Sequence, residues 1–179
     1  KLMSKIIKNA LISLSDKSGI EKILKNLKKY KINIISSGGT YKEIKKLGYN
    51  CTEISKYTGF KEMLGGRVKT LHPKIHAGIL HDRNNKKHLK EMIKEKFTSI
   101  DLIIVNFYPF QETVINSKNQ KKIIESIDIG GPAMVRAAAK NFENVTIITE
   151  KNDYKNLINE IKKNNGKTTL KFREIMSSK

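Results

Sequence analysis

The chain has 179 residues, of which 38% are hydrophobic and 30% charged, and its formal net charge is +19. This length supports one substantial hydrophobic core, so we expect a single domain over residues 1–179. The sequence contains neither the roughly 20-residue apolar run of a membrane helix nor the apolar stretch of a secretory signal, and we therefore expect a cytoplasmic protein with no membrane partner.

The positive charge resembles that of nucleic-acid-binding domains. However, only Arg67, Arg83, Arg136 and Arg173 are arginines among the 36 basic residues, whereas recognition of bases and bidentate phosphate favours arginine. Lysine pairs fall on the polar sides of helical patterns, where charge is usually solvated. We therefore expect nonspecific attraction of anions and no specific nucleic-acid partner.

Cysteine and histidine usage argues against a metal centre. Cys51 is the only cysteine, which excludes an internal disulfide and a cysteine-built zinc site. His72, His76 and His81 have no nearby carboxylates or thiols to complete a ligand set, and Pro73 disrupts a two-histidine helical face. We predict no metal site, and we expect His72 to order its loop.

Strands and helices alternate along the chain. Aliphatic runs predict strands at residues 9–13, 32–35, 102–105 and 145–148. Apolar periodicity predicts helices at residues 20–30, 86–96, 119–127, 133–140 and 153–163. The alternation indicates a three-layer α/β domain around a parallel sheet with right-handed crossovers.

Two capping boxes are predicted at helix starts, one from Ser18 with Glu21 and one from Thr40 with Glu43. Two residues precede the first methionine, and another helical pattern starts near Phe172, close to the last residue. We therefore expect the chain to be a piece of a longer protein.

Polar clusters follow the first two predicted strands, where parallel sheets bind ligands. Ser15, Asp16 and Lys17 precede a helix and suit an anion, although an ordinary helix cap explains them equally well. The run 36–40 contains paired glycines that let backbone amides converge on a phosphate. It is neither a Walker loop nor a dinucleotide fingerprint, and a tight turn is the alternative.

The segment 65–73 lacks clear periodicity, and long irregular segments in compact domains are usually functional. Gly65 and Gly66 precede Arg67, Lys69 and Thr70, which predicts a loop that brings two cations and a hydroxyl to one dianion. The alternative is a surface loop with solvated charges.

Two further clusters are Asn106 to Phe110, after a predicted interior strand, and residues 128–132, before a predicted helix. Asp128 precedes a glycine pair and a proline, so backbone amides there could serve an oxyanion while Asp128 acts on a proton. A capping Asp128 and a Tyr108 packed on the core are the alternative.

Taken together, these motifs resemble the N-terminal domain of the AICAR formyltransferase and IMP cyclohydrolase family. The resemblance covers most of the chain and is weak only at residues 81–97. It implies a methylglyoxal-synthase-like fold, a homodimer, and closure of 5-formamidoimidazole-4-carboxamide ribotide to inosine monophosphate and water. It implies no metal or organic cofactor. The resemblance also implies fusion to a formyltransferase domain, which we expect to lie outside residues 1–179.

The resemblance also implies roles for individual residues. It implies that Asp128 accepts a carboxamide proton, that amides near Ile129 and Gly130 bind the oxyanion, and that Lys140 supplies the proton with which hydroxide leaves as water. Lys69 and Tyr108 would form a pair at the ring. The implied catalytic residues are Lys69, Tyr108, Asp128 and Lys140. The implied binding residues are Ser15, Asp16, Lys17, Ser37, Gly38, Gly39, Thr40, Arg67, Val68, Thr70, Val105, Asn106, Ile129 and Gly130.

Three other functions stay open from the sequence. A methylglyoxal-synthase-type lyase and a phosphate-sensing regulatory domain would share the anion site at the strand ends. Neither explains Tyr108 and the 128–140 clusters as well as a cyclohydrolase does. A lysine-rich nucleic-acid-binding domain is supported only by charge.

Overall fold

The computed structural model describes residues 4–107 and 110–179. Five parallel strands form the central sheet in the order β4-β3-β2-β5-β6. They are β2 (Asn9–Leu14), β3 (Asn33–Ser36), β4 (Thr52–Glu53), β5 (Leu102–Asn106) and β6 (Thr146–Ile148). A separate antiparallel pair joins β1 (Lys5–Ile6) to β7 (Lys167–Thr168). The predicted parallel-sheet α/β fold is confirmed.

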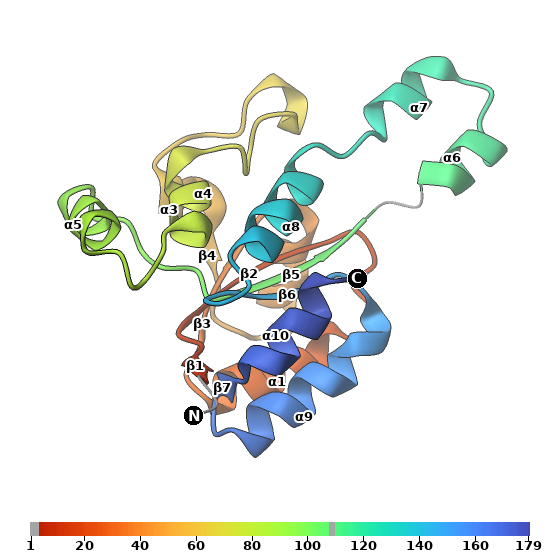
Figure 1. Cartoon of the computed structure of the whole chain (residues 1–179). Helices are drawn as coiled ribbons and strands as arrows, with labels where there is room; N and C mark the ends of the chain where they lie inside the picture. The colour runs from red at the N-terminus through yellow and green to blue at the C-terminus, as the bar shows by residue number, and fades with distance from the viewer. Residues whose placement is uncertain (1–3, 108–109) are drawn as a thin grey trace.

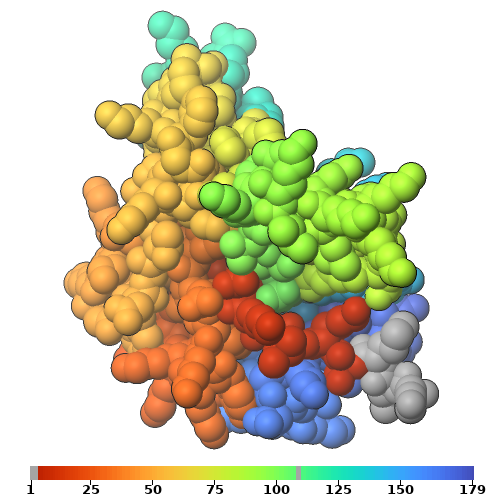
Figure 2. Space-filling model, turned by 90° about the vertical axis from the view of Figure 1, so that its left-hand side faces the viewer, coloured from red at the N-terminus to blue at the C-terminus, as the bar shows by residue number. Residues whose placement is uncertain are grey.

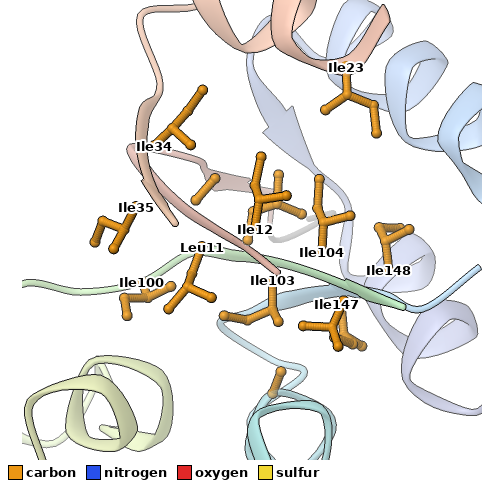
Figure 3. Close-up of a cluster of buried hydrophobic side chains, with 14 of the residues drawn as sticks. Leu11, Ile12, Ile23, Ile34, Ile35, Ile100, Ile103, Ile104, Ile147 and Ile148 are labelled. Atoms are coloured by element: carbon orange, nitrogen blue, oxygen red, sulfur yellow. The ribbon is translucent and has the colours of Figure 1, made fainter. Parts of the chain in front are cut away.

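Helices cover both faces of the sheet, with α1 and α9 on one side and α4 and α8 on the other (Figures 1 and 3). The first face carries α1 (Ile20–Lys29) and α9 (Tyr154–Lys163). The second carries α4 (Pro73–Leu80) and α8 (Gly130–Lys140). The other helices are α2 (Gly38–Lys46), α3 (Ile54–Thr58), α5 (Lys86–Lys94), α6 (Phe110–Asn116), α7 (Gln120–Glu125), α10 (Leu170–Ser177) and the short 3-10 turns Leu64–Gly66 and Lys151–Asp153.

The strand register explains the aliphatic runs in the sequence. Leu11 pairs with Ile103, which pairs with Ile147, so these side chains form one row on the same face. Ile12 and Ile104 form the adjacent row, which points to the opposite face (Figure 3). All five side chains are buried. Burial on both faces is what continuous apolar strands of a parallel sheet require.

Both predicted capping boxes are wrong. Helix α1 starts after Gly19, and the Ser18 hydroxyl donates to Asp16 Oδ1 instead of capping the helix. Thr40 lies inside α2, which begins two residues earlier. In both places a nearby acceptor competes for the hydroxyl that the sequence pattern assigned to the cap.

One partly buried and one fully buried arginine, Arg83 and Arg173, fix the edge of the sheet where the strands begin. Arg83 Nη1 lies 3.0 Å from Asp101 Oδ1, and the other oxygen of Asp101 accepts the backbone N–H groups of Lys8 and Asn9. The side chain of Arg173 is fully buried. It donates to the carbonyl oxygens of residues 142, 143 and 168, at 2.8, 2.9 and 2.5 Å. Helix α10 is thereby joined to the end of α8.

Two segments project from the domain, residues 59–71 and the arm of α6 and α7 (Figure 1). In Figure 2 the yellow segment rises above the body of the molecule, with the teal arm behind it. Neither α6 nor α7 contains a buried residue. In the ranges 4–107 and 110–179, no helix combines the length and apolarity needed to cross a membrane.

Candidate functional site

The candidate site lies at the carboxyl ends of β2, β3 and β5. The chain leaves β2 toward β3 and β4 on one side and returns to β5 on the other, so the sheet order reverses between β2 and β5. Ligands of parallel sheets bind at such a crevice. Asn106, at the end of β5, crosses it: its Oδ1 accepts from the N–H of Ser15 at 2.6 Å and of Asp16 at 3.1 Å, and its Nδ2 donates to Asp16 O at 2.7 Å.

These contacts assign Asn106 to loop organisation, because its amide is occupied by the backbone of the loop after β2. Asp16 has a similar role, since its carboxylate accepts from the N–H and hydroxyl of Ser18. Those hydrogen bonds lower the pKa of Asp16, and the nearby Lys151 ammonium lowers it further. Any contact of Asp16 with an anionic substrate is therefore expected to use its backbone.

Helix α2 begins directly after β3 and points its N-terminus at the crevice. Ser37 precedes the helix, is largely buried, and makes no side-chain cap. Thr40 Oγ1 accepts from Leu14 N at 2.9 Å and donates to Leu14 O at 3.0 Å. The hydroxyl of Thr40 is thus occupied, and only its backbone N–H can serve a ligand at the helix start.

Two lysine ammoniums from different loops meet over this helix start. A Cβ at Gly38 would lie 3.1 Å from Lys69 Nζ, and one at Gly39 would lie 3.5 Å from Lys17 Nζ. Lys17 Nζ also donates to Ser15 O at 3.2 Å. Backbone N–H groups, the helix dipole and two cations thus converge on one place, which is the arrangement that binds a phosphate.

The segment after Gly59 delivers Lys69 and Thr70 to this place. Lys69 Nζ lies 2.8 Å from Glu62 Oε2. Thr70 is buried and packs so closely on Gly130 that any side chain at position 130 would overlap the Thr70 hydroxyl. The phosphate-binding features at α2 are thereby joined to the start of α8.

Arg67 does not join the two lysines. Its guanidinium is exposed and pairs with Glu125 on α7, so it links the two projecting segments. The hydrogen bonds and charge of Glu125 raise the pKa of Arg67. Val68 pairs with Met63 through the backbone. Of the two cations that the sequence analysis assigns to one dianion, Lys69 lies over the start of α2 and Arg67 does not.

Asp128 lies at the start of α8. Its Oδ1 accepts from Gly131 N at 3.0 Å, and its other oxygen lies against the same glycine. This hydrogen bond caps the helix, as the alternative interpretation of the sequence expected. Asp128 is exposed, and the neighbouring Ile129 side chain is 57% exposed. The carboxylate is therefore accessible to a ligand while its orientation is fixed.

Two predicted residues, Lys140 and Val105, do not present their side chains to this place. Lys140 is the last residue of α8, whose 11 residues span roughly 16 Å, so its exposed side chain is at the opposite end from Asp128. The Val105 side chain is buried in the core, which leaves only its backbone for a ligand. Tyr108 lies outside the described residues.

The histidines have structural roles. His72 Nδ1 accepts from Lys74 N at 3.1 Å and caps α4, and its ring contacts Phe60. This confirms that His72 orders its loop. Within the part of the chain that the structure describes, no three histidine, cysteine or acidic side chains cluster so as to hold a metal ion.

A hollow of about 530 Å³ lies between α1 and α9 and begins beside the loop that follows β2. It is lined by Lys22, Lys25, Lys151, Lys155 and Lys162 together with Ile158 and Tyr154. Four of these lysines belong to the solvated faces of α1 and α9, and Lys151 lies in the 3-10 turn before α9. The polar groups that converge on one point lie instead at the strand ends.

Two sequence patterns of known protein families match this chain, each over a different segment. The sequence pattern described as "MGS-like domain" matches residues 19–133, more than half of the chain. The chain belongs to the MGS-like domain family. Residues 138–179, which follow the segment matched by the first pattern, match the pattern described as "AICARFT/IMPCHase bienzyme". The resemblance inferred from the motifs is thereby confirmed.

Curated relatives of this MGS-like domain are named bifunctional purine biosynthesis protein PurH. The protein of Clostridium perfringens strain SM101 is 49% identical over 96% of this chain, and that of Bradyrhizobium diazoefficiens is 46% identical over 97%. The chain spans only 34% and 33% of their lengths. The solved structure titled "Crystal structure of ForH" has a TM-score of 0.83 and 28% identity, covering 96% of this chain and 88% of that one.

Sequence reasoning missed Glu62, the partner of Lys69. The available signal was symmetry, because Glu62 and Lys69 stand at equal distances from the Gly65–Gly66 pair. A single acidic residue in a basic stretch does not form a recognisable motif. Glu62 can therefore be assigned as the partner of Lys69 only from the structure, in which the loop folds back on itself.

Proposed function

We propose that this chain is an IMP cyclohydrolase, which closes 5-formamidoimidazole-4-carboxamide ribotide to inosine monophosphate with loss of water. The observation that carries the proposal is the convergence of Lys17 and Lys69 over Gly38 and Gly39. Thr70 packs on Gly130 and so joins this anion site to the start of α8, where Asp128 accepts from Gly131 N. The names of the relatives add support, although the chain spans a third of their length.

Phosphate binding is assigned to the start of α2. The N–H groups of Gly38, Gly39 and Thr40, the ammoniums of Lys17 and Lys69, and the hydroxyl of Ser37 would surround the substrate phosphate. Thr70 would extend the contacts toward α8. Arg67 would contribute only after it leaves Glu125, because the two side chains are paired in this structure.

Ring closure is assigned to the start of α8. The carboxamide nitrogen of the substrate attacks the formyl carbon, and Asp128 accepts a proton from that nitrogen. The bond between the formyl carbon and oxygen then breaks, and the oxygen leaves as water with one hydrogen from the carboxamide nitrogen and one from the formamide nitrogen. Gly131 N–H already serves Asp128 and residue 132 is proline, so we assign the developing oxyanion to the N–H groups of Ile129 and Gly130. Binding both reacting groups of one molecule in register supplies much of the acceleration.

The parts played by Tyr108 and Lys140 remain predictions from the resemblance. Helix α8 separates Lys140 from Asp128 of the same chain. Proton donation by Lys140 would therefore require a second copy of the chain or a rearrangement of α8. We also propose the homodimer that the resemblance implies, and the mass of the purified chain at micromolar concentration tests it.

The direct test is an ultraviolet assay of the purified chain with the formylated ribotide, because ring closure changes the chromophore. We expect inosine monophosphate to form without added metal or folate, also after treatment with a chelator. Folded protein that forms no product under these conditions would contradict the proposal. Formation of methylglyoxal from a triose phosphate would instead favour the lyase alternative.

A further inference from the structure

Glu62 lies beside Lys69 because the loop that carries both folds back on itself. Met63 and Val68 each donate to the carbonyl oxygen of the other, with N···O distances of 3.1 and 3.3 Å. In such an antiparallel pair the residues on either side also face each other, here Glu62 and Lys69. Their charged atoms are 2.8 Å apart, and the Lys69 side chain is only 24% exposed.

The turn at the tip of this loop leaves space for the Glu62 carboxylate. Gly66 has a φ of 97°, and a Cβ at this position would lie 2.7 Å from Glu62 Oε1. Glycine alone supplies both this backbone conformation and the space. The glycine pair that the sequence analysis associated with an anion therefore serves the pairing of Glu62 with Lys69.

The negative charge of Glu62 opposes anion binding at this place. The start of α2, Lys17 and Lys69 attract an anion, whereas a carboxylate within contact distance of Lys69 repels one. A site selected only for phosphate affinity would not contain Glu62. A carboxylate that fixes the end of a flexible lysine side chain does have a use, because a catalytic group must be held in a productive geometry.

We propose that Glu62 is a positioning residue for Lys69, which fixes the Lys69 ammonium for ring closure while it weakens phosphate binding. This inference rests on the proposed function. It assigns to Glu62 no contact with the substrate and no proton transfer. Glu62 affects the reaction only because it fixes the position of the Lys69 ammonium.

The test variant is Glu62→Gln, which keeps the size of the side chain and removes its charge. Single-turnover ring closure at saturating substrate is expected to fall about 10- to 100-fold, as displaced catalytic groups do. Calorimetry with inorganic phosphate is expected to show tighter binding, and unchanged binding would contradict the second part of the proposal. Glu91→Gln, on α5 and outside the site, is the charge-matched control and should change neither measurement.

A double-mutant cycle with Lys69→Ala decides whether Glu62 acts through Lys69. We expect Glu62→Gln to have no further effect on the rate in the Lys69→Ala background. The same fold loss in both backgrounds, or a wild-type rate for Glu62→Gln, would overturn the inference. Thermal unfolding checks that each variant is folded. If Glu62→Gln is not, Glu62→Asp replaces it in the cycle, because its shorter side chain also breaks the contact.

Failure of the proposed function gives a different result. Wild-type chain that forms no inosine monophosphate would overturn that function, and the same cycle would then be measured with inorganic phosphate. Glu62→Gln should tighten phosphate binding in the wild-type background and not in Lys69→Ala. Equal effects in the two backgrounds would show that Glu62 does not act through Lys69.

Discussion

Thr40 bonds both backbone polar groups of Leu14 and thereby ties the start of α2 to the end of β2. The contact is buried. Thr40→Val removes the hydroxyl and keeps the shape, so we expect the free energy of unfolding to fall by about 1 to 3 kcal/mol, as for a buried hydrogen-bonding group left without its partner. Urea unfolding measures this change.

Thr40→Ser is the matched control, because it keeps the hydroxyl and loses only a methyl group. It should retain most of the stability lost in Thr40→Val. A stable Thr40→Val chain that binds inosine monophosphate much more weakly would show instead that the hydroxyl contacts the ligand.

Lys17→Ala should weaken the binding of inosine monophosphate by about 1 to 3 kcal/mol, the range of a lost charge-assisted hydrogen bond. The reason is the position of the Lys17 ammonium over Gly39. Equilibrium titration measures the effect. Lys22→Ala, on the exposed face of α1, removes the same charge without touching the start of α2, and an equal loss of affinity there would contradict the assignment.

Asp128→Asn should lower the rate of ring closure by about 100-fold or more while product affinity changes little, as expected for a general base. The asparagine oxygen can still accept from Gly131 N, so the cap of α8 should survive. Single-turnover kinetics measures the rate.

Lys140→Ala is the companion variant. Because Lys140 lies at the other end of α8, we expect a smaller loss of rate than in Asp128→Asn. An equal or larger loss would show that Lys140 reaches the substrate, either from a second copy of the chain or after a rearrangement of α8.

Arg173→Lys should destabilise the fold by about 2 to 4 kcal/mol, because one ammonium cannot replace a planar guanidinium that serves three carbonyl groups. Arg136→Lys on the exposed side of α8 is the control, and it should stay within about 0.5 kcal/mol of wild type. Urea unfolding compares the two, and equal stability would argue against the structural role of Arg173.

Stability should fall on acidification through the region of histidine titration, in part because of His81. Burial lowers the pKa of His81 from its usual 6.5, and the nearby Arg83 charge acts in the same direction. Its Nδ1 faces the Ala77 carbonyl and its Nε2 faces the Ser99 hydroxyl, which suits the neutral ring.

Because the unfolded chain takes up this proton at higher pH than the folded chain, the contribution of His81 is complete above about pH 6.5 and declines below it. Unfolding free energies at about pH 7.5 and pH 5.5 should therefore differ less in His81→Gln than in wild type. His88→Gln serves as the histidine-matched control. An unchanged pH dependence in His81→Gln would exclude this contribution.

The sheet could be predicted from the sequence because its strands are buried on both faces and read as uninterrupted aliphatic runs, such as 102–105. Helix α4 was missed for a related reason. It is mostly apolar and follows a loop without periodicity, so residues 73–80 offer no amphipathic pattern that distinguishes a helix.

The site was predicted as a set of strand-end clusters, and the structure does bring Lys17, Lys69 and the Gly38–Gly39 pair together. The sequence could not assign the bonds that each side chain makes. Thr40 and Asn106 are both at the site, yet their polar groups bind the backbone of the loop at β2. Whether a polar side chain binds a ligand or a neighbouring peptide group depends on interatomic distances, which a sequence motif does not specify.

The attachment of α10 to α8 determines where the chain can be divided. The two family patterns adjoin between residues 133 and 138, within α8, yet the later segment contributes β6 and the arginine that binds the carbonyl groups after that helix. A fragment ending at this junction would cut α8 short and leave the apolar edge of β5 unpaired, and such edges recruit strands from other molecules. The boundary between two patterns of sequence similarity is therefore not a boundary of folding, and expression of residues 1–137 alone should yield aggregates.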